Sequence, residues 1–406
     1  MAVTFDPTDD AVLRDPYPLF TEMRAAGGVH WSEPLAGWVA VDWASVQTVV
    51  TTPQVFSADR MVQILDRLPE PRRTTAADVL RWLSLWMVFQ DPPNHTRLRR
   101  HLASVINPRM VESLRESTTR IVTDVLDELP KDEPFDFYTR FGLTVPGYVV
   151  MDLLGVPRDR LAEVKQWSDE MMLFIGSARG VEDKYGRARH GAHSMAELFR
   201  GLIEQRRAEP RDDVLTRMIT STVDGQTLTS DELIASMMMI ANGAQETTAH
   251  LFSNGLLALQ ATPDVARTLV ADLDGLVATA VEELLRFDSP VLSAGRLVAS
   301  DTELGGQKLR AGDRIFAMLA AANRDPAVFD APNELRITGR PNSHLAFSKG
   351  VHFCLGAPVA RLEAQIAFTE LLTRFPNLRL AEPLESIPWV NSLVARGPQR
   401  LPVLLG

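Results

Sequence analysis

Cysteine is almost absent from this chain, since Cys354 is the only one in 406 residues. An intrachain disulfide is therefore impossible, and a reducing compartment such as the cytoplasm is predicted. The chain also lacks any run of eighteen apolar residues without a charge, so we expect it not to span a membrane. The first residues, Met1 to Pro7, have neither the basic nor the apolar segment of a secretion signal.

An excess of basic residues is missing as well. Lys and Arg number 42 against 52 Asp and Glu, and the formal net charge of −10 disfavours nucleic acid as a partner. Glycine-rich fingerprints for flavin, nicotinamide or nucleotide phosphates are also missing. No Gly/Ser-rich or Pro-rich linker divides the chain. We therefore expect one domain over residues 1–406 with no fused redox module. A monomer is also expected.

The lone cysteine stands among small and aromatic residues, in the run FSKGVHFCLG at positions 347–356. Gly350 and Gly356 lack Cβ atoms, so the backbone can approach a flat ring and direct N–H groups at the sulfur. Phe347 and Phe353 can supply an apolar wall. A haem-iron thiolate needs these features, because the sulfur must stay anionic and shielded from water.

The residues after the cysteine predict a helix. The segment from Val359 to Leu372 has helical composition and follows Pro358, a residue tolerated in a first helical turn. Cys354 would then lie at the N-terminus of this helix, where the helix macrodipole favours a negative charge.

The run matches the pattern F-x-x-G-x-H-x-C-x-G at its five specified positions, with Phe347, Gly350, His352, Cys354 and Gly356. It therefore resembles the haem-ligand loop of the cytochrome P-450 superfamily. Many members have glycine directly after the phenylalanine, where this chain has serine. The resemblance implies haem b as the cofactor, Cys354 as the axial ligand of its iron, and Phe347, His352 and Gly356 as haem-binding residues.

A second informative segment extends from Thr229 to Gln260. Thr229 and Glu232 fit a capping box at a helix start. At 1.5 Å per residue, a helix of this length would extend roughly 45 Å, and its middle is apolar on nearly every face. Glu246 and Thr247, an acid beside an alcohol, lie within it. Such a pair is costly to bury unless it has a function.

The residues around this pair, Gly243-Ala244-Gln245-Glu246-Thr247-Thr248, resemble the oxygen-binding motif [AG]-G-x-[DE]-T-T of the same superfamily. The chain departs from it by exchanging two small residues, Gly-Ala for Ala-Gly. The resemblance implies that Glu246 and Thr247 relay protons during oxygen activation, a form of general acid catalysis. The Thr247 hydroxyl can also donate to the Gly243 carbonyl and bend the helix.

An acid and a base lie three positions apart at Glu283 and Arg286, on one face of a predicted helix where they can pair. Ahead of the cysteine run, the two resemble the superfamily's E-x-x-R motif. The resemblance implies a structural role in the core beneath the haem, with Arg340 as a further partner.

Haem propionates need cations or hydrogen-bond donors at the ring edge. Residues 91–99, DPPNHTRLR, resemble the bacterial D-P-P-x-H-x-x-x-R segment. The resemblance implies His95 and Arg99 as propionate partners. Arg296 and His352 match the other two propionate positions.

The walls of the substrate pocket rest on the resemblance alone. The implied positions are almost all apolar: Leu85, Trp86, Val88, Met239, Asn242, Gly243, Leu292, Ala294 and Leu393.

Regular elements can be predicted for much of the chain. Apolar residues recur at helical spacing from Leu98 to Phe199, whereas Gly37 to Val41, Leu297 to Ala299 and Arg314 to Phe316 read as short strands. From Met61 to Phe89 the pattern is irregular. The expected fold is mainly α with a minor β region, with the haem between the long helix and the helix that follows the cysteine loop.

Together the motifs imply a bacterial haem-thiolate monooxygenase. It would insert one oxygen atom from O₂ into a small apolar organic substrate, with electrons from a separate ferredoxin and ferredoxin reductase. Three alternatives stay open: a peroxide-driven peroxygenase, which usually lacks the acid–alcohol pair; a non-catalytic haem sensor, which would not need that pair; and a cysteine hydrolase, for which His352 is poorly placed as a base.

Overall fold

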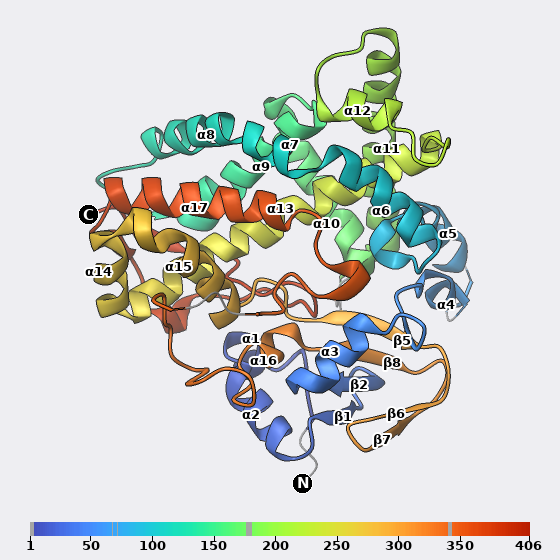
Figure 1. Cartoon of the computed structure of the whole chain (residues 1–406), viewed down its shortest axis with the longest axis horizontal. Coiled ribbons are helices and arrows are strands. Elements are labelled where there is room, and N and C mark those ends of the chain that lie inside the picture. The colour runs from blue at the N-terminus through green and yellow to red at the C-terminus, as the bar shows by residue number, and fades with distance from the viewer. Residues whose placement is uncertain (1–3, 67, 71, 176–180, 340–342) are drawn as a thin grey trace. The chain divides into compact units, whose positions relative to one another are not determined.

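The structure is a computed structural model that describes residues 4–66, 68–70, 72–175, 181–339 and 343–406. The chain forms two compact units. Figure 1 labels the helices and strands of which they consist. Unit 1 consists of Met1–Phe56, Ser113–Pro146 and Glu246–Gly406, and unit 2 of Ser57–Glu112 and Gly147–Gln245.

Unit 2 is built from helices. They are α4 (Met61–Asp66), α5 (Arg72–Leu83), α6 (Asn94–Val105), α10 (Leu161–Ile175), α11 (Lys184–Ala208) and α12 (Val214–Thr220), with short 3₁₀ turns at η1 (Met87–Phe89) and η3 (Arg158–Arg160). The long helices α10 and α11 pack against each other, and α5 packs against α11.

The prediction of an irregular segment from Met61 to Phe89 was wrong, because helices α4 and α5 lie there. In α5, Ala76, Val79, Leu80 and Leu83 are buried at the spacing of one helix face. The packing of this face against α11 explains why the segment is helical despite the prolines before it.

Unit 1 contains most of the remaining helices. They are α1 (Asp10–Arg14), α2 (Tyr17–Ala25), α3 (Trp43–Thr51), α8 (Arg115–Asp127), α14 (Pro263–Ala271), α15 (Leu273–Phe287), α16 (Leu319–Ala322) and α17 (Ala357–Arg374), with η2 (Tyr138–Leu143), η4 (Gly350–His352) and η5 (Leu384–Ser386). Helices α7 (Pro108–Ser113), α9 (Thr144–Leu154) and α13 (Ser230–Ala261) contribute residues to both units.

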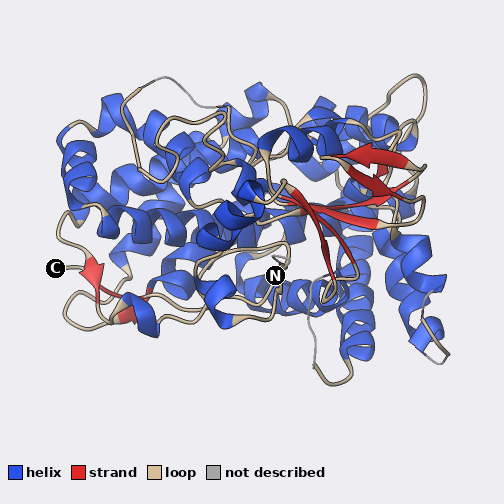
Figure 2. Ribbon diagram, turned by 90° about the horizontal axis from the view of Figure 1, so that it is seen from below, coloured by secondary structure: helices blue, strands red, loops and turns tan. Residues whose placement is uncertain are grey.

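The strands form one five-stranded sheet and two smaller groups (Figure 2). In order, the large sheet contains β1 (Val29–Ser32), β2 (Gly37–Ala40), β8 (Arg314–Ala317), β5 (Ala294–Val298) and β3 (Phe56–Ser57). The smaller groups are β4 (Phe135–Asp136), β10 (Pro402–Leu404) and β9 (Arg379–Leu380), and the hairpin of β6 (Thr302–Leu304) with β7 (Gln307–Leu309). The three predicted strands are confirmed as β2, β5 and β8.

The large sheet separates two apolar cores of unit 1, because successive side chains of a strand point to opposite faces. Ala40 of β2 packs in one core with Val46 and Val49 of α3. Its neighbour Val39 packs in the other core with Phe20 and further side chains. The predicted fold class, mainly α with a minor β region, is confirmed.

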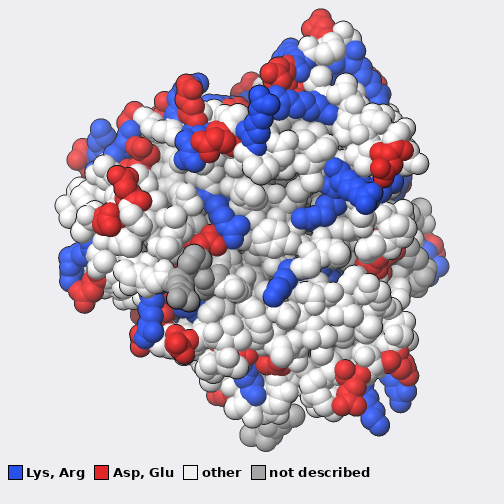
Figure 3. Space-filling view, in the orientation of Figure 1, with Lys and Arg blue, Asp and Glu red and all other residues white. Residues whose placement is uncertain are grey.

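Lys and Arg side chains lie among Asp and Glu side chains over the face of the molecule drawn in Figure 3. Lys165 and Asp169 of α10 are an example of an ion pair within one helix. None of the helices formed by the described residues combines the length and the hydropathy that a membrane span requires.

Candidate functional site

The cysteine run forms a tight loop in unit 1. The N–H of Cys354 donates to the carbonyl of Phe347 at 2.9 Å, and the N–H of Phe353 donates to that of Gly350 at 3.1 Å. Gly350 has a φ of +71°, and a Cβ there would lie 3.2 Å from the Thr51 Cα. This position therefore requires glycine, and the loop holds Cys354 through its backbone.

The side chain of Cys354 is exposed in front of α17. The helix begins at Ala357 with Pro358 in its first turn, which confirms the predicted start. A Cβ at Gly356 would lie 3.9 Å from the cysteine Sγ, so the glycine leaves the approach to sulfur open. Phe353, 38% exposed, adds an apolar ring to the same loop. An open sulfur at a helix N-terminus fits a haem thiolate better than a buried core cysteine.

An ion pair between Glu282 and Arg361, which the sequence analysis did not predict, lies at the start of this loop. Arg361 of α17 donates to the Glu282 carboxylate of α15 at 2.6 and 2.7 Å, and His344 lies 3.2 Å from it. The Arg361 guanidinium also lies 4.6 Å from the centre of the Phe347 ring. Burial opposes the ionisation of Glu282, but the hydrogen bonds from Arg361 and His344 lower its pKa to about 2. These contacts join α15, α17 and the cysteine loop.

Glu283 and Arg286 form a buried two-pronged ion pair on α15, with N···O distances of 2.7 and 2.8 Å. Arg286 also donates to three backbone carbonyls, those of Asn323, Pro332 and Glu334. The proposed additional partner, Arg340, lies outside the described residues. Arg286 thus ties α15 to the chain that precedes the cysteine loop, and its five hydrogen bonds match the five N–H donors of its buried guanidinium.

Helix α13 begins as predicted, because the N–H of Thr229 donates to Glu232 at 2.9 Å and that of Glu232 donates to Thr229 at 3.2 Å. Its middle is less buried than the turns around it. Glu246 and Thr247 are half-buried and Gly243 is exposed. Outside α13, no described atom comes within 4 Å of the position that a Cβ of Gly243 would take. A small side chain at position 243 would therefore meet no described neighbour outside its own helix.

The four predicted propionate partners fall into two pairs. His95 and Arg99 lie one turn apart on α6 of unit 2, with His95 buried and Arg99 half-buried. In unit 1, Arg296 is buried on β5 and donates to the Gly295 carbonyl at 2.9 Å, and His352 is half-buried in η4. That the two pairs converge on one ring stays a prediction.

The predicted pocket residues of unit 2 differ in burial. Trp86 and Met239 are buried, Leu85 is half-buried and Val88 is 41% exposed. The Trp86 indole N–H has no hydrogen-bond partner among the described residues, so a ligand could provide one.

Asn242, the one polar side chain proposed for the pocket, already has partners. It accepts from the Ser168 hydroxyl at 2.7 Å and donates to the Met238 carbonyl at 2.8 Å. Its amide therefore joins α13 to α10, and it is less available to a substrate than the sequence suggested.

The pocket residues predicted in unit 1 lie near the C-terminal loop. Leu292 is buried, and its N–H donates to the Val394 carbonyl at 2.7 Å. Leu393 is half-buried and packs against the core that contains Leu292, while Ala294 is half-buried in β5. Their contact with a substrate stays a prediction.

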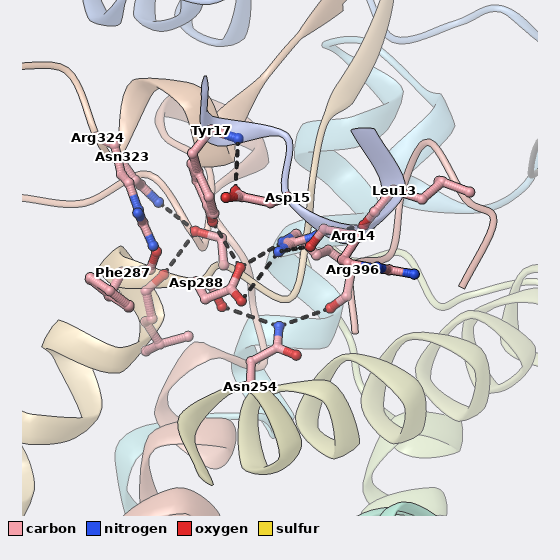
Figure 4. Close-up of polar contacts among 12 residues, drawn as sticks. Leu13, Arg14, Asp15, Tyr17, Asn254, Phe287, Asp288, Asn323, Arg324 and Arg396 are labelled. Atoms are coloured by element: carbon pink, nitrogen blue, oxygen red, sulfur yellow. Dashed lines mark hydrogen bonds and ion pairs between the residues drawn. The ribbon is translucent and has the colours of Figure 1, made fainter. Parts of the chain in front are cut away.

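The C-terminal loop is anchored by Arg396 (Figure 4). The Arg396 Nε lies 2.6 Å from the Asp288 carboxylate, which also accepts from the Tyr17 hydroxyl at 2.8 Å. Asn254 of α13 donates to the Arg396 carbonyl at 3.0 Å, and Arg396 donates to the Leu13 carbonyl at 2.9 Å. The loop is thereby fixed to α13, to the end of α15 and to the N-terminal segment. No local pattern in the sequence pointed to this network.

Comparison with known proteins agrees with these features. The family model described as "Cytochrome P450" matches residues 59–385. Cytochrome P450 CYP107DY1 of Priestia megaterium is 33% identical over 90% of this chain and 89% of its own length. Vitamin D(3) 25-hydroxylase of Pseudonocardia autotrophica is 33% identical over 97% of this chain and 94% of its own length.

A solved structure supports the same conclusion. P450BioI, crystallised with an acyl carrier protein that bears hexadec-9Z-enoic acid, superposes with a TM-score of 0.89 at 28% identity, covering 97% of this chain and 99% of its own. The chain belongs to the cytochrome P450 family. It is a monooxygenase with haem b bound through a cysteine thiolate, and it uses an organic substrate, O₂ and redox partners.

Proposed function

We propose that this enzyme inserts one oxygen atom of O₂ into a C–H bond of a small apolar organic molecule. The other oxygen atom would leave as water, with two electrons and two protons consumed. The electrons would come from a separate ferredoxin and ferredoxin reductase. The observation that supports the proposal most is the acid–alcohol pair, Glu246 and Thr247, which lies half-buried in the middle of α13.

Cys354 would hold the haem iron through its thiolate, since no other cysteine exists in the chain. When bound, a thiolate-ligated haem supplies the chemistry that cleaves the O–O bond. The chain's own contribution is to keep the sulfur anionic. The N-terminus of α17 favours its negative charge, and the loop backbone fixes its position. Phe347 and Gly356 would border the haem next to it.

The roles of the distal pair follow from the chemistry of their side chains. Glu246 can hold and release a proton, and the Thr247 hydroxyl can both donate and accept a hydrogen bond. Side by side on α13, they would carry protons from solvent to the reacting oxygen. Glu246, with 28% of its side chain exposed, would take up the protons that pass to Thr247.

The propionates would be held by His95, Arg99, Arg296 and His352, which offer donors and positive charge. Glu283 and Arg286 would stabilise the core beneath the ring. We also propose that the enzyme acts as a monomer in the cytoplasm.

The substrate class is proposed from the pocket and the relatives. Nearly all proposed wall residues are apolar, which favours recognition by shape and burial. The name of one relative refers to vitamin D(3), and the structure of another contains hexadec-9Z-enoic acid on an acyl carrier protein. We therefore propose a mainly hydrocarbon substrate.

A compound library tests the proposal. The purified holoenzyme is titrated with each compound, and the one with the largest low- to high-spin shift of the haem becomes the probe substrate. Turnover under ¹⁸O₂ with NADH, a ferredoxin and its reductase should yield product containing one ¹⁸O atom. Product without ¹⁸O would contradict the proposed monooxygenation.

A peroxygenase is the second candidate. It would convert the probe substrate with H₂O₂ faster than with the ferredoxin system, and would not need Glu246. The presence of both Glu246 and Thr247 favours the O₂-dependent reaction.

A further inference from the structure

One ionisable side chain close to Glu246 has no role in the function described so far. His250 lies one turn further along α13 and is 0% exposed. Its Nε2 is 3.6 Å from the Glu246 Oε1, which is the separation of an ion pair and not of a hydrogen bond. Neither ring nitrogen has a hydrogen-bond partner among the described residues. Burying an imidazole without hydrogen-bond partners lowers the stability of the folded protein, and an apolar side chain at this position would be less destabilising.

Two neighbours hold the imidazole in place from outside α13. The Tyr138 ring of η2 stacks on it with centres 5.1 Å apart and an interplanar angle of 15°. On another side the backbone of the C-terminal loop approaches so closely that a Cβ at Gly397 would lie 2.0 Å from the His250 Nδ1. Glycine at this position therefore provides the space that the ring occupies.

The loop that carries Gly397 is itself fixed. Arg396 precedes it and is bound to Asp288, while Asn254, one turn beyond His250 on α13, donates to the Arg396 carbonyl (Figure 4). The ring can therefore move little, and its Nε2 is the nitrogen that lies toward Glu246. A side chain held this firmly is suited to orienting a neighbour.

We propose that His250 is a positioning residue for Glu246. Its Nε2–H attracts the Glu246 carboxylate and restricts the rotation of that side chain, so that the carboxylate stays beside Thr247. Tyr138 and Gly397 serve this role by fixing the imidazole plane. The inference rests on the proposed function, because it assumes that Glu246 delivers protons.

Substitutions at His250 separate a positioning role from a packing role. His250→Phe keeps an aromatic ring against Tyr138 but has no donor, whereas His250→Gln keeps an N–H that can reach Glu246. We expect His250→Phe to raise the hydrogen peroxide released per NADH several-fold, in the ferredoxin-driven reaction with the probe substrate. His250→Gln should restore most of the coupling to product. The inference would be overturned if the wild type and His250→Phe released the same amount of peroxide per NADH while Glu246→Gln released more. That result would leave the proposed function intact.

Gly397→Ala tests the same relationship without changing an ionisable group. The added methyl group should displace the imidazole and give a peroxide yield like that of His250→Phe. Gly201→Ala is the matched control, since no described atom outside its own helix lies within 4 Å of its Cβ position. A Gly397→Ala enzyme that releases no more peroxide than Gly201→Ala would contradict the inference.

Thermal unfolding of the holoenzyme gives a readout that does not depend on turnover. We compare the midpoints of His250→Phe, Glu246→Gln and the double variant. A direct interaction between the side chains of His250 and Glu246 predicts that the shifts of the unfolding midpoint are not additive. The midpoint of the double variant should then fall by less than the sum of the two single shifts. Additive shifts would contradict a direct interaction. If Glu246→Gln leaves coupling to product unchanged, the proposed role of Glu246 itself fails.

Discussion

Arg396 and Asp288 form an ion pair, with 6% and 13% of their side chains exposed, although they are 108 residues apart in the chain. The Tyr17 hydroxyl donates to the same carboxylate, at 2.8 Å. Burial by itself would lower the pKa of Arg396, but Asp288 and Tyr17 raise it above its usual value. Burial, followed by the charge of Asp288, raises the pKa of Tyr17. Arg396 therefore stays charged and the phenol keeps its proton, so both continue to donate to Asp288.

Removing one partner of this pair should be strongly destabilising. Arg396→Met leaves the Asp288 carboxylate, which is only 13% exposed, without its cation, and we expect a loss of about 3–5 kcal/mol in the free energy of unfolding. Urea-induced unfolding measures the change. Arg310→Met is the control, because its pair with Asp301 is exposed (74% and 61%) and exposed pairs contribute little to stability. Similar losses in the two variants would contradict the account of the network.

Glu363 on α17 predicts a dependence of stability on pH. Its side chain is buried, Oε2 has no partner among the described residues, and burial raises its pKa to about 8. The folded protein thus holds a proton that the unfolded chain releases above its ordinary pKa, 4.5. The contribution of this bound proton to the free energy of unfolding is fully present below pH 4.5 and decreases as the pH rises toward 8. At pH 7 the decrease is on the order of 3 kcal/mol.

The Glu363→Gln variant should lack this decline. We expect its unfolding free energy, relative to that of the wild type, to increase between pH 5 and pH 8, as measured in urea at several pH values. Glu370→Gln on the same helix is the control, since 30% of that side chain is exposed. A constant difference between Glu363→Gln and the wild type across this range would show that Glu363 does not titrate as described.

Thr247→Ala should separate oxygen activation from binding. The variant is expected to keep haem and the spin shift with the probe substrate, because the hydroxyl acts on protons rather than on the substrate. Product formation should fall about 10-fold or more while NADH is still consumed and hydrogen peroxide accumulates. Thr247→Ser keeps a hydroxyl and should retain most of the coupling. Normal product yield in Thr247→Ala would remove the hydroxyl from the proposed proton pathway.

Local signals in the sequence were sufficient for several elements. The capping box of Thr229 and Glu232 and the apolar run after it predicted α13, and Pro358 marked the start of α17. Strands β2, β5 and β8 were also found from their composition. Each of these elements is specified by residues close in the chain.

Features that depend on distant residues were missed. The parallel pairing of β2 with β8 brings Trp38 next to Ile315, and no local pattern specifies it. Helix α5 was missed because its apolar face gains stability only by packing against α11. The Glu282–Arg361 pair likewise joins two helices, and its only signal was the position of Glu282 beside the E-x-x-R motif.

The ligation of haem by Cys354 is the central claim, and the spectrum of the reduced protein with CO tests it most directly. The wild type should show the strongly red-shifted Soret band of a thiolate-ligated haem. Cys354→Ser and Cys354→His should bind haem without that band, because no second cysteine can replace the ligand. Retention of the band by either variant would contradict the assignment of Cys354 as the iron ligand.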